Sequence, residues 1–188
     1  MHILGISGTP RKRGNSEILL TAALEPFVEA GWDITKILLS EKKIEPCTGC
    51  DTCVERKSCC INDDMSEVYS AFKKCDAIII SAPAYWRNVP AQLKALIDRT
   101  YAAKGVLKGK FGGAIAVGRG QGGGQAIVLN IIHNYYLSSG ALCVPGECNG
   151  ISAVADKPDD ILSQPRRLEQ ARILGRNIIE YIYEGEKI

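Results

Sequence analysis

Several common features are missing from this chain. It has no run of about 18 consecutive apolar residues, the length that a membrane-spanning helix needs. It has no internal repeat and no Pro- or Ser-rich linker, and charge of one sign is not in excess, because 23 Lys and Arg oppose 21 Asp and Glu. We therefore expect neither a membrane protein nor one that attracts nucleic acid through bulk charge.

The amino terminus also lacks a basic leader followed by an apolar segment, so we expect a cytoplasmic protein. Thiols stay reduced in that compartment, and those of the eight cysteines that are clustered are therefore expected to be metal ligands or redox groups before they are disulfides. With 188 residues, 46% of them hydrophobic and 23% charged, the chain predicts a single globular domain over residues 1–188.

Short apolar runs alternate with helical patterns five times along the chain. The alternation predicts a parallel sheet with helices on both faces, and a ligand at the carboxyl ends of its strands. The helix over 16–30 contains Pro26, which should kink it or end it early. Expected strands are 2–6, 33–39, 77–82, 112–117 and 141–144; expected helices are 16–30, 64–74, one capped by Asn88, 126–138 and 165–183.

The loop after the first expected strand is rich in hydrogen-bond donors and opens a helix. Phosphate is bound by such donors together with the free N–H groups of a helix N-terminus. The loop contains neither a Walker sequence nor G-x-G-x-x-G, and it could instead be a polar turn in which Asn15 or Ser16 only caps the helix. The candidate phosphate ligands are Ser7, Thr9, Arg11, Asn15 and Ser16.

Two further loops follow the third and fourth expected strands. The segment 81–90 places Tyr85 and Trp86 where they could stack on a flat ring, although both rings could simply cover a helix end. The segment 118–125 contains five glycines, whose bare backbone could meet the edge of a planar ligand.

The sharpest signal is a run of cysteines between residues 40 and 63. The spacing C-x2-C-x2-C-x5-C predicts a [4Fe–4S] cluster held by Cys47, Cys50, Cys53 and Cys59, with Cys60 as a spectator or a substitute ligand. Zinc is the second alternative, although it more often uses two separated C-x-x-C pairs. Reduced structural thiols or a redox disulfide are the remaining ones.

Taken together, these segments resemble the iron–sulfur flavoproteins of the NADPH-dependent FMN reductase group. The resemblance extends from Met1 to about Val144, and no single piece carries it. The segments that carry it are Ser7–Arg11 with Gly14–Ser16, the four spaced cysteines, Asp63–Met65, Pro83–Trp86 with Pro90 and Leu93–Lys94, and the glycines after Val117.

This resemblance implies a flavodoxin-like sheet of five parallel strands in the order 2-1-3-4-5, with the cysteine-rich loop after strand 2. It also implies FMN, with its phosphate on the first loop and its isoalloxazine ring against the other two, and homodimers that often pair into tetramers. The residues implied for the ring are Pro83, Ala84, Tyr85, Trp86, Asn88, Gly118, Gly120 and Gly122.

We therefore expect an oxidoreductase that uses FMN and a [4Fe–4S] cluster to pass electrons between one- and two-electron partners, with ferredoxin or NAD(P)H as candidate donors. One alternative is a cluster-free NAD(P)H-dependent FMN or quinone reductase, and another is a non-enzymatic flavin- or zinc-binding module. No side chain in the sequence is required to act as a catalytic acid or base.

Overall fold

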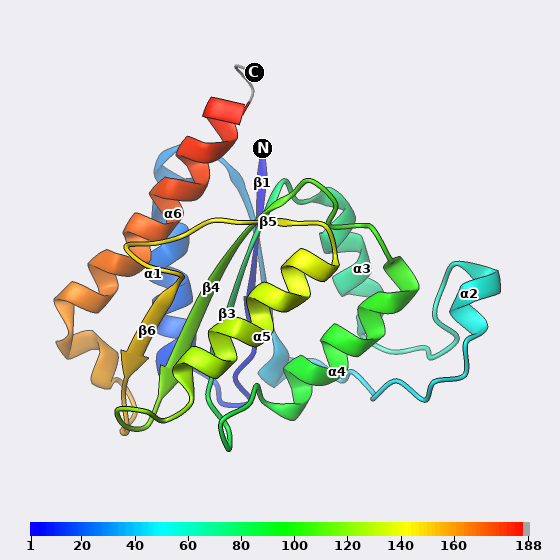
Figure 1. The fold of residues 1–188 in the computed structure, drawn as a ribbon, viewed down its shortest axis with the longest axis horizontal. Coiled ribbons are helices and arrows are strands. Elements are labelled where there is room, and N and C mark those ends of the chain that lie inside the picture. Colours follow the sequence, from blue (N-terminus) through cyan, green and yellow to red (C-terminus); the bar gives the residue numbers. More distant parts are fainter. Residues whose placement is uncertain (186–188) are drawn as a thin grey trace.

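The computed structural model describes residues 1–185 and shows an α/β fold built on one parallel sheet (Figure 1). The expected order 2-1-3-4-5 is confirmed, with β3 paired to both β1 and β4 at the centre. The strand β3 is a continuous apolar run that is buried on both faces, as expected of a central parallel strand. The strands are β1 (His2–Ser7), β2 (Asp33–Leu38), β3 (Ala77–Pro83), β4 (Phe111–Gly118), β5 (Leu142–Cys143) and β6 (Ile151–Val154).

The fifth position of the sheet is split between two short strands, which corrects the single strand expected over 141–144. The strand β5 pairs with the start of β4, and β6 pairs with its end. The residues between them leave the sheet edge, where the Asn177 side chain donates to the Pro145 carbonyl. The run 151–154 alternates buried and exposed residues and is too short for its apolar pattern to stand out.

Helices cover both faces of the sheet (Figure 1). On one face α1 and α6 enclose a core that includes Leu20, Phe27 and Leu174, and on the other α3, α4 and α5 enclose a second core. The helices are α1 (Asn15–Glu29), α2 (Thr52–Arg56), α3 (Met65–Lys74), α4 (Ala91–Arg99), α5 (Gln125–Ser138) and α6 (Pro165–Gly185), with 3-10 turns η1 (Leu39–Glu41), η2 (Thr100–Ala103) and η3 (Asp160–Ser163). None of these helices is long and apolar enough to cross a membrane.

Two helix ends differ from the expected ones. Pro26 does not end α1 early, because the helix continues to Glu29 and packs against α6 and the core. Asn88 does not cap α4, which begins at Ala91 after Pro90; Asn88 belongs instead to a tight turn described below. The short helix α2 was not expected. It lies within residues 45–61, called the cysteine segment below, where the apolar residues of the sequence show no helical or strand periodicity.

The contact between α1 and α6 depends on Gly175. A Cβ atom at this position would lie 2.3 Å from the Ala23 carbonyl oxygen and 3.2 Å from Pro26 Cγ, so only glycine lets the two helix backbones approach this closely.

We predict that Gly175→Ala destabilises the protein by about 1–3 kcal/mol, the usual range for overpacking. Helix propensity alone would make the same change stabilising. The free energy of unfolding, measured in urea, decides between the two, with Arg166→Ala on the exposed side of α6 as the control. An unchanged or higher stability of Gly175→Ala would contradict the close contact.

Candidate functional site

Three loops that follow β1, β3 and β4 meet at the carboxyl edge of the sheet and form a cleft. Eight of the predicted flavin-binding residues line it: Thr9, Arg11, Asn15, Ser16, Pro83, Ala84, Tyr85 and Gly118. Five others do not line it in this structure: Ser7, Trp86, Asn88, Gly120 and Gly122. The sequence reasoning missed five lining residues: Gly14, Val117, Arg119, Ala155 and Asp156.

The N-terminus of α1 opens into this cleft and offers donors to an anion. Gly14 occupies the N-cap position and supplies no capping side chain, so the N–H groups of Asn15 and Ser16 have no acceptor within the helix. Arg11 is exposed at the rim, and Thr9 is buried with its hydroxyl accepting from the Arg11 N–H at 3.2 Å. Ser7 Oγ is buried and has no hydrogen-bond partner among the described residues. These donors suit a phosphate group.

The loop after β6 forms a further wall of the cleft that the sequence did not reveal. The Asn15 side chain donates to the Lys157 carbonyl at 2.8 Å and accepts from the Ile161 N–H at 3.3 Å. These bonds occupy the Asn15 amide, so a phosphate would meet its backbone N–H. Arg119 and Asp156 form an exposed ion pair across the rim.

A tight turn with an unusual backbone lies beside the cleft. Tyr85 and Asn88 exchange two backbone hydrogen bonds of 2.8 and 2.9 Å, and the two central residues, Trp86 and Arg87, have φ values of 49° and 59°. Such turns ordinarily require Asn-Gly at these positions. Trp86 is fully exposed, so packing within the described chain does not explain why this strained pair is kept.

The glycine-rich loop 118–125, called the glycine loop below, packs directly against the turn 85–88. Gly124 has a φ of 99°, and a Cβ there would lie 2.6 Å from the Arg87 Cα atom. At the other end of the loop, Gln125 donates to the Gly120 carbonyl at 3.0 Å, and its buried side chain fills the space that a Cβ on Gly118 would occupy. The glycines therefore fix the position of both loops, and Gln125 is a positioning residue that the sequence did not single out.

A second cavity, of about 40 Å³, is lined by all five cysteines of the cysteine segment. They are Cys47, Cys50, Cys53, Cys59 and Cys60. No three His, Cys, Asp or Glu side chains in the described range lie close enough to hold a single metal ion. The donor set of this cavity is made of thiols, which are the ligands of iron–sulfur clusters and of structural zinc sites.

Within this cavity two cysteines lie in contact. Cys50 Sγ and Cys60 Sγ are 3.5 Å apart, and the Thr52 hydroxyl donates to Cys50 Sγ at 3.3 Å. Hydrogen bonds from Thr52, reinforced by Cys60, lower the pKa of Cys50 to about 6. The same contact raises the pKa of Cys60. Cys50 is therefore prepared to act as a thiolate near neutral pH, which is the form that binds metal.

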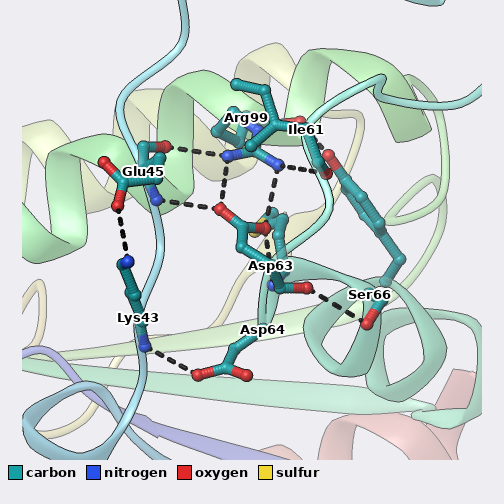
Figure 2. Close-up of polar contacts among 9 residues, drawn as sticks. Lys43, Glu45, Ile61, Asp63, Asp64, Ser66 and Arg99 are labelled. Atoms are coloured by element: carbon teal, nitrogen blue, oxygen red, sulfur yellow. Dashed lines mark hydrogen bonds and ion pairs between the residues drawn. The ribbon is translucent and has the colours of Figure 1, made fainter.

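A buried ion pair closes the base of the cysteine segment (Figure 2). Arg99, at the end of α4, forms a bidentate pair with Asp63 at 2.8 and 3.0 Å, and both side chains are almost fully buried. The guanidinium also donates to the carbonyls of Glu45 and Ile61, at 2.8 and 3.4 Å. Glu45 precedes the first cysteine and Ile61 follows the last, so one side chain ties the two ends of the segment together.

We call the buried Arg99–Asp63 pair and its hydrogen bonds to the backbone the clamp. Asp63 contributes two of these backbone bonds. Its carboxylate accepts from the N–H groups of Glu45 and Met65, at 2.9 and 3.1 Å. Burial by itself would raise the pKa of Asp63, but the hydrogen bonds from Arg99 and from these two N–H groups lower it. The pair is therefore ionised at neutral pH.

The cleft and the cysteine cavity share no lining residue. In Figure 1 the segment around α2 projects from the side of the molecule, away from the lower edge where β1, β3 and β4 end. One chain thus carries two separate candidate cofactor sites.

Comparison with known proteins decides the family. The model of the NADPH-dependent FMN reductases matches residues 1–155. An iron–sulfur flavoprotein of Methanocaldococcus jannaschii is 37% identical over 188 residues, covering 97% of each chain, and one of Methanosarcina thermophila is 40% identical over 147 residues, covering 77% of each. The chain belongs to the iron–sulfur flavoproteins of the NADPH-dependent FMN reductase family.

Solved structures agree on the fold. The chain superposes on a flavone reductase with a TM-score of 0.77 at 21% identity, over 99% of this chain, and it spans 64% of that protein's length. An NAD(P)H:quinone oxidoreductase from Methanothermobacter marburgensis gives a TM-score of 0.71 at 20% identity, with 95% of this chain and 96% of that one covered. The expected flavodoxin-like fold is confirmed.

The strained turn gives a prediction that separates stability from ligand binding. Replacing the central pair by Asn-Gly (Trp86→Asn with Arg87→Gly) should stabilise the cofactor-free protein by about 1 kcal/mol, because residues suited to positive φ remove strain. The same variant should bind FMN more weakly. Thermal unfolding of the cofactor-free protein and fluorescence titration with FMN measure the two effects. A less stable variant would show that the turn is not strained, and unchanged FMN affinity would exclude it from the binding site.

Proposed function

We propose that this protein is an electron-transfer oxidoreductase that binds FMN in the cleft and a [4Fe–4S] cluster in the cysteine cavity. It would pass electrons between one- and two-electron partners. The observation that carries the proposal is that all five cysteines of the segment 47–60 line one cavity. The same chain has a cleft with free hydrogen-bond donors for an anion at the carboxyl ends of β1 and β3, where the strand order of the sheet reverses.

The cleft residues fit FMN by their chemistry. The α1 N-terminus, Thr9 and Arg11 would hold the phosphate. Pro83, Tyr85 and the backbone of Gly118 line the part of the cleft that would receive the flat ring. The loop carries no adenine-recognition fingerprint, which favours a mononucleotide over a dinucleotide as the resident cofactor.

The cysteine cavity fits a cluster by its donor set. Cys47, Cys50, Cys53 and Cys59 would be the ligands, and Cys60 would stay outside the cluster. When bound, FMN supplies two-electron chemistry that can be released in single steps, and the cluster supplies one-electron chemistry. The residues of this chain would bind and orient both groups. None of the residues lining the cleft is required as an acid or a base.

A basic groove beside the cysteine cavity favours an acidic one-electron donor such as ferredoxin. The groove is lined by Lys57, Lys73 and Lys104 and by no acidic residue. It shares Cys53, Tyr101 and Ala102 with the cysteine cavity, so a carrier that docks there lies next to a proposed cluster ligand. Opposite charges of this kind speed the encounter of electron-transfer partners.

A homodimer would bring the two cofactors of neighbouring chains together. The cleft and the cysteine cavity are separate within one chain, and the fully exposed Trp86 and half-exposed Tyr85 lie beside the cleft. Exposed aromatic residues of this kind are enriched in protein interfaces. We therefore keep the expected dimer as a proposal, with the turn 85–88 at the contact.

Anaerobic analysis of the purified protein tests the main proposal. We expect FMN, iron and acid-labile sulfide in the ratio of one flavin to one [4Fe–4S] cluster per chain. FMN without iron or sulfide would favour the alternative, a cluster-free NAD(P)H-dependent FMN or quinone reductase. Stoichiometric zinc in place of iron would contradict the electron-transfer role.

The fourth ligand can be identified by two matched substitutions. Cys59→Ser should lose the cluster or destabilise it, and Cys60→Ser should keep it, since of these two cysteines only Cys59 belongs to the predicted ligand set. Iron and sulfide content after anaerobic reconstitution measure both. The reverse result would move the fourth ligand to Cys60, and full iron content in both variants would exclude a unique fourth ligand.

The groove predicts a charge-dependent reaction with the donor. Lys73→Glu and Lys104→Glu, made singly, should each slow reduction by ferredoxin several-fold at low ionic strength, and the difference should shrink as salt is added. Stopped-flow reduction measures the rate. Arg166→Glu on α6 is the charge-matched control, and reduction by a neutral photochemical donor checks that the cofactors of the variants are intact. Equal ferredoxin rates in all variants would place the docking site elsewhere.

A further inference from the structure

Arg99 has more hydrogen-bonding capacity than the clamp uses. A guanidinium carries five N–H donors. Its two terminal nitrogens make four bonds, two to the Asp63 carboxylate and one each to the carbonyls of Glu45 and Ile61. The fifth donor, on Nε, is buried and has no acceptor in the described part of the chain.

This unused donor belongs to a side chain that lines the cysteine cavity. Arg99 is 2% exposed, and it lines the cavity together with Asp98, Tyr101 and the five cysteines. Cys59 lines the same cavity as Arg99. A buried donor of this kind ordinarily has a partner, and an unpaired one beside a candidate cofactor site is explained by a redox role or by a bound group that accepts from it.

We propose that Arg99 Nε–H donates a hydrogen bond to a sulfur of the bound cluster or of its ligand Cys59, in addition to clamping the segment. This inference rests on the proposed cluster. The clamp fixes the guanidinium plane, so the direction of the Nε–H is set before the cluster binds. The other four donors cannot serve this purpose without releasing Asp63 or a backbone carbonyl.

The proposed bond has a definite electrostatic consequence. Hydrogen bonds and positive charge at the sulfurs stabilise the reduced, more negative cluster and raise its reduction potential. Asp63 opposes this effect, because its carboxylate neutralises the guanidinium. Arg99 and Asp63 should therefore shift the potential in opposite directions, whereas a purely structural clamp would treat the two residues alike.

Pulsed EPR tests the contact between Arg99 Nε and the cluster directly, on reduced holoprotein from cells that were grown with ¹⁵N-arginine. We expect a ¹⁵N coupling to the cluster in the wild type and in Arg56→Lys, which removes the arginine of α2 and serves as the matched control. The coupling should be absent in Arg99→Lys. A wild-type protein that is loaded with iron and sulfide but shows no ¹⁵N coupling overturns the inference, and so does a coupling lost in Arg56→Lys.

Redox titration of the loaded fraction tests the consequence. Arg99→Lys should shift the cluster midpoint to a more negative potential, and Asp63→Asn should shift it to a more positive one. Shifts in the same direction, or none, overturn the tuning role. If Arg99→Lys or Asp63→Asn holds no cluster, the pulsed EPR comparison of wild type and Arg56→Lys still tests the contact between arginine and the cluster. A wild-type protein without iron and sulfide would instead refute the proposed function, and this inference with it.

Discussion

The buried pair between Arg99 and Asp63 is the interaction on which the cysteine segment depends. It joins α4 to both ends of a segment that contains only one short helix and has almost no buried apolar side chains of its own. Removal of one partner from such a pair typically costs about 3–5 kcal/mol, because the other charge stays buried. The segment therefore takes its position from α4 and the helical core of the domain.

The cleft is organised by a different constraint, the close approach of backbones. Gly124 lets the glycine loop lie against Arg87, and Gly118 makes room for the Gln125 side chain. The result is a closely packed edge next to the α1 N-terminus, where the donors for a phosphate are free. Packing around glycine positions this site, whereas ionic hydrogen bonds position the cysteines.

Much of this arrangement could be predicted from the sequence. The continuous apolar run of β3 and the repeated βα pattern predict a parallel sheet, and the family resemblance implies its strand order. Strand ends followed by polar or glycine-rich loops locate the cleft. The cysteine spacing locates the second site. These features are local in the chain, so their patterns are visible without the fold.

What the sequence did not reveal depends on contacts between distant residues. Arg99 looks like one more charged residue at a helix end, and its pairing with Asp63 appears only once the chain is folded. The same holds for the wall that residues 155–161 add to the cleft through Asn15, and for β6, which is defined by its pairing with β4. Asn88 was misassigned as a cap because a turn with positive φ at Trp86 and Arg87 contradicts ordinary residue preferences.

The central claim is that the clamp holds the cysteine segment in place before any metal binds. Hydrogen exchange of the metal-free protein tests it at the amides of Glu45 and Met65, which donate to Asp63. We expect both amides to be strongly protected, while the amide of Gly49, which has no acceptor among the described residues, exchanges at the rate of an open chain. Equal, fast exchange at all three amides would contradict the account, because the segment would then be ordered only by its cofactor.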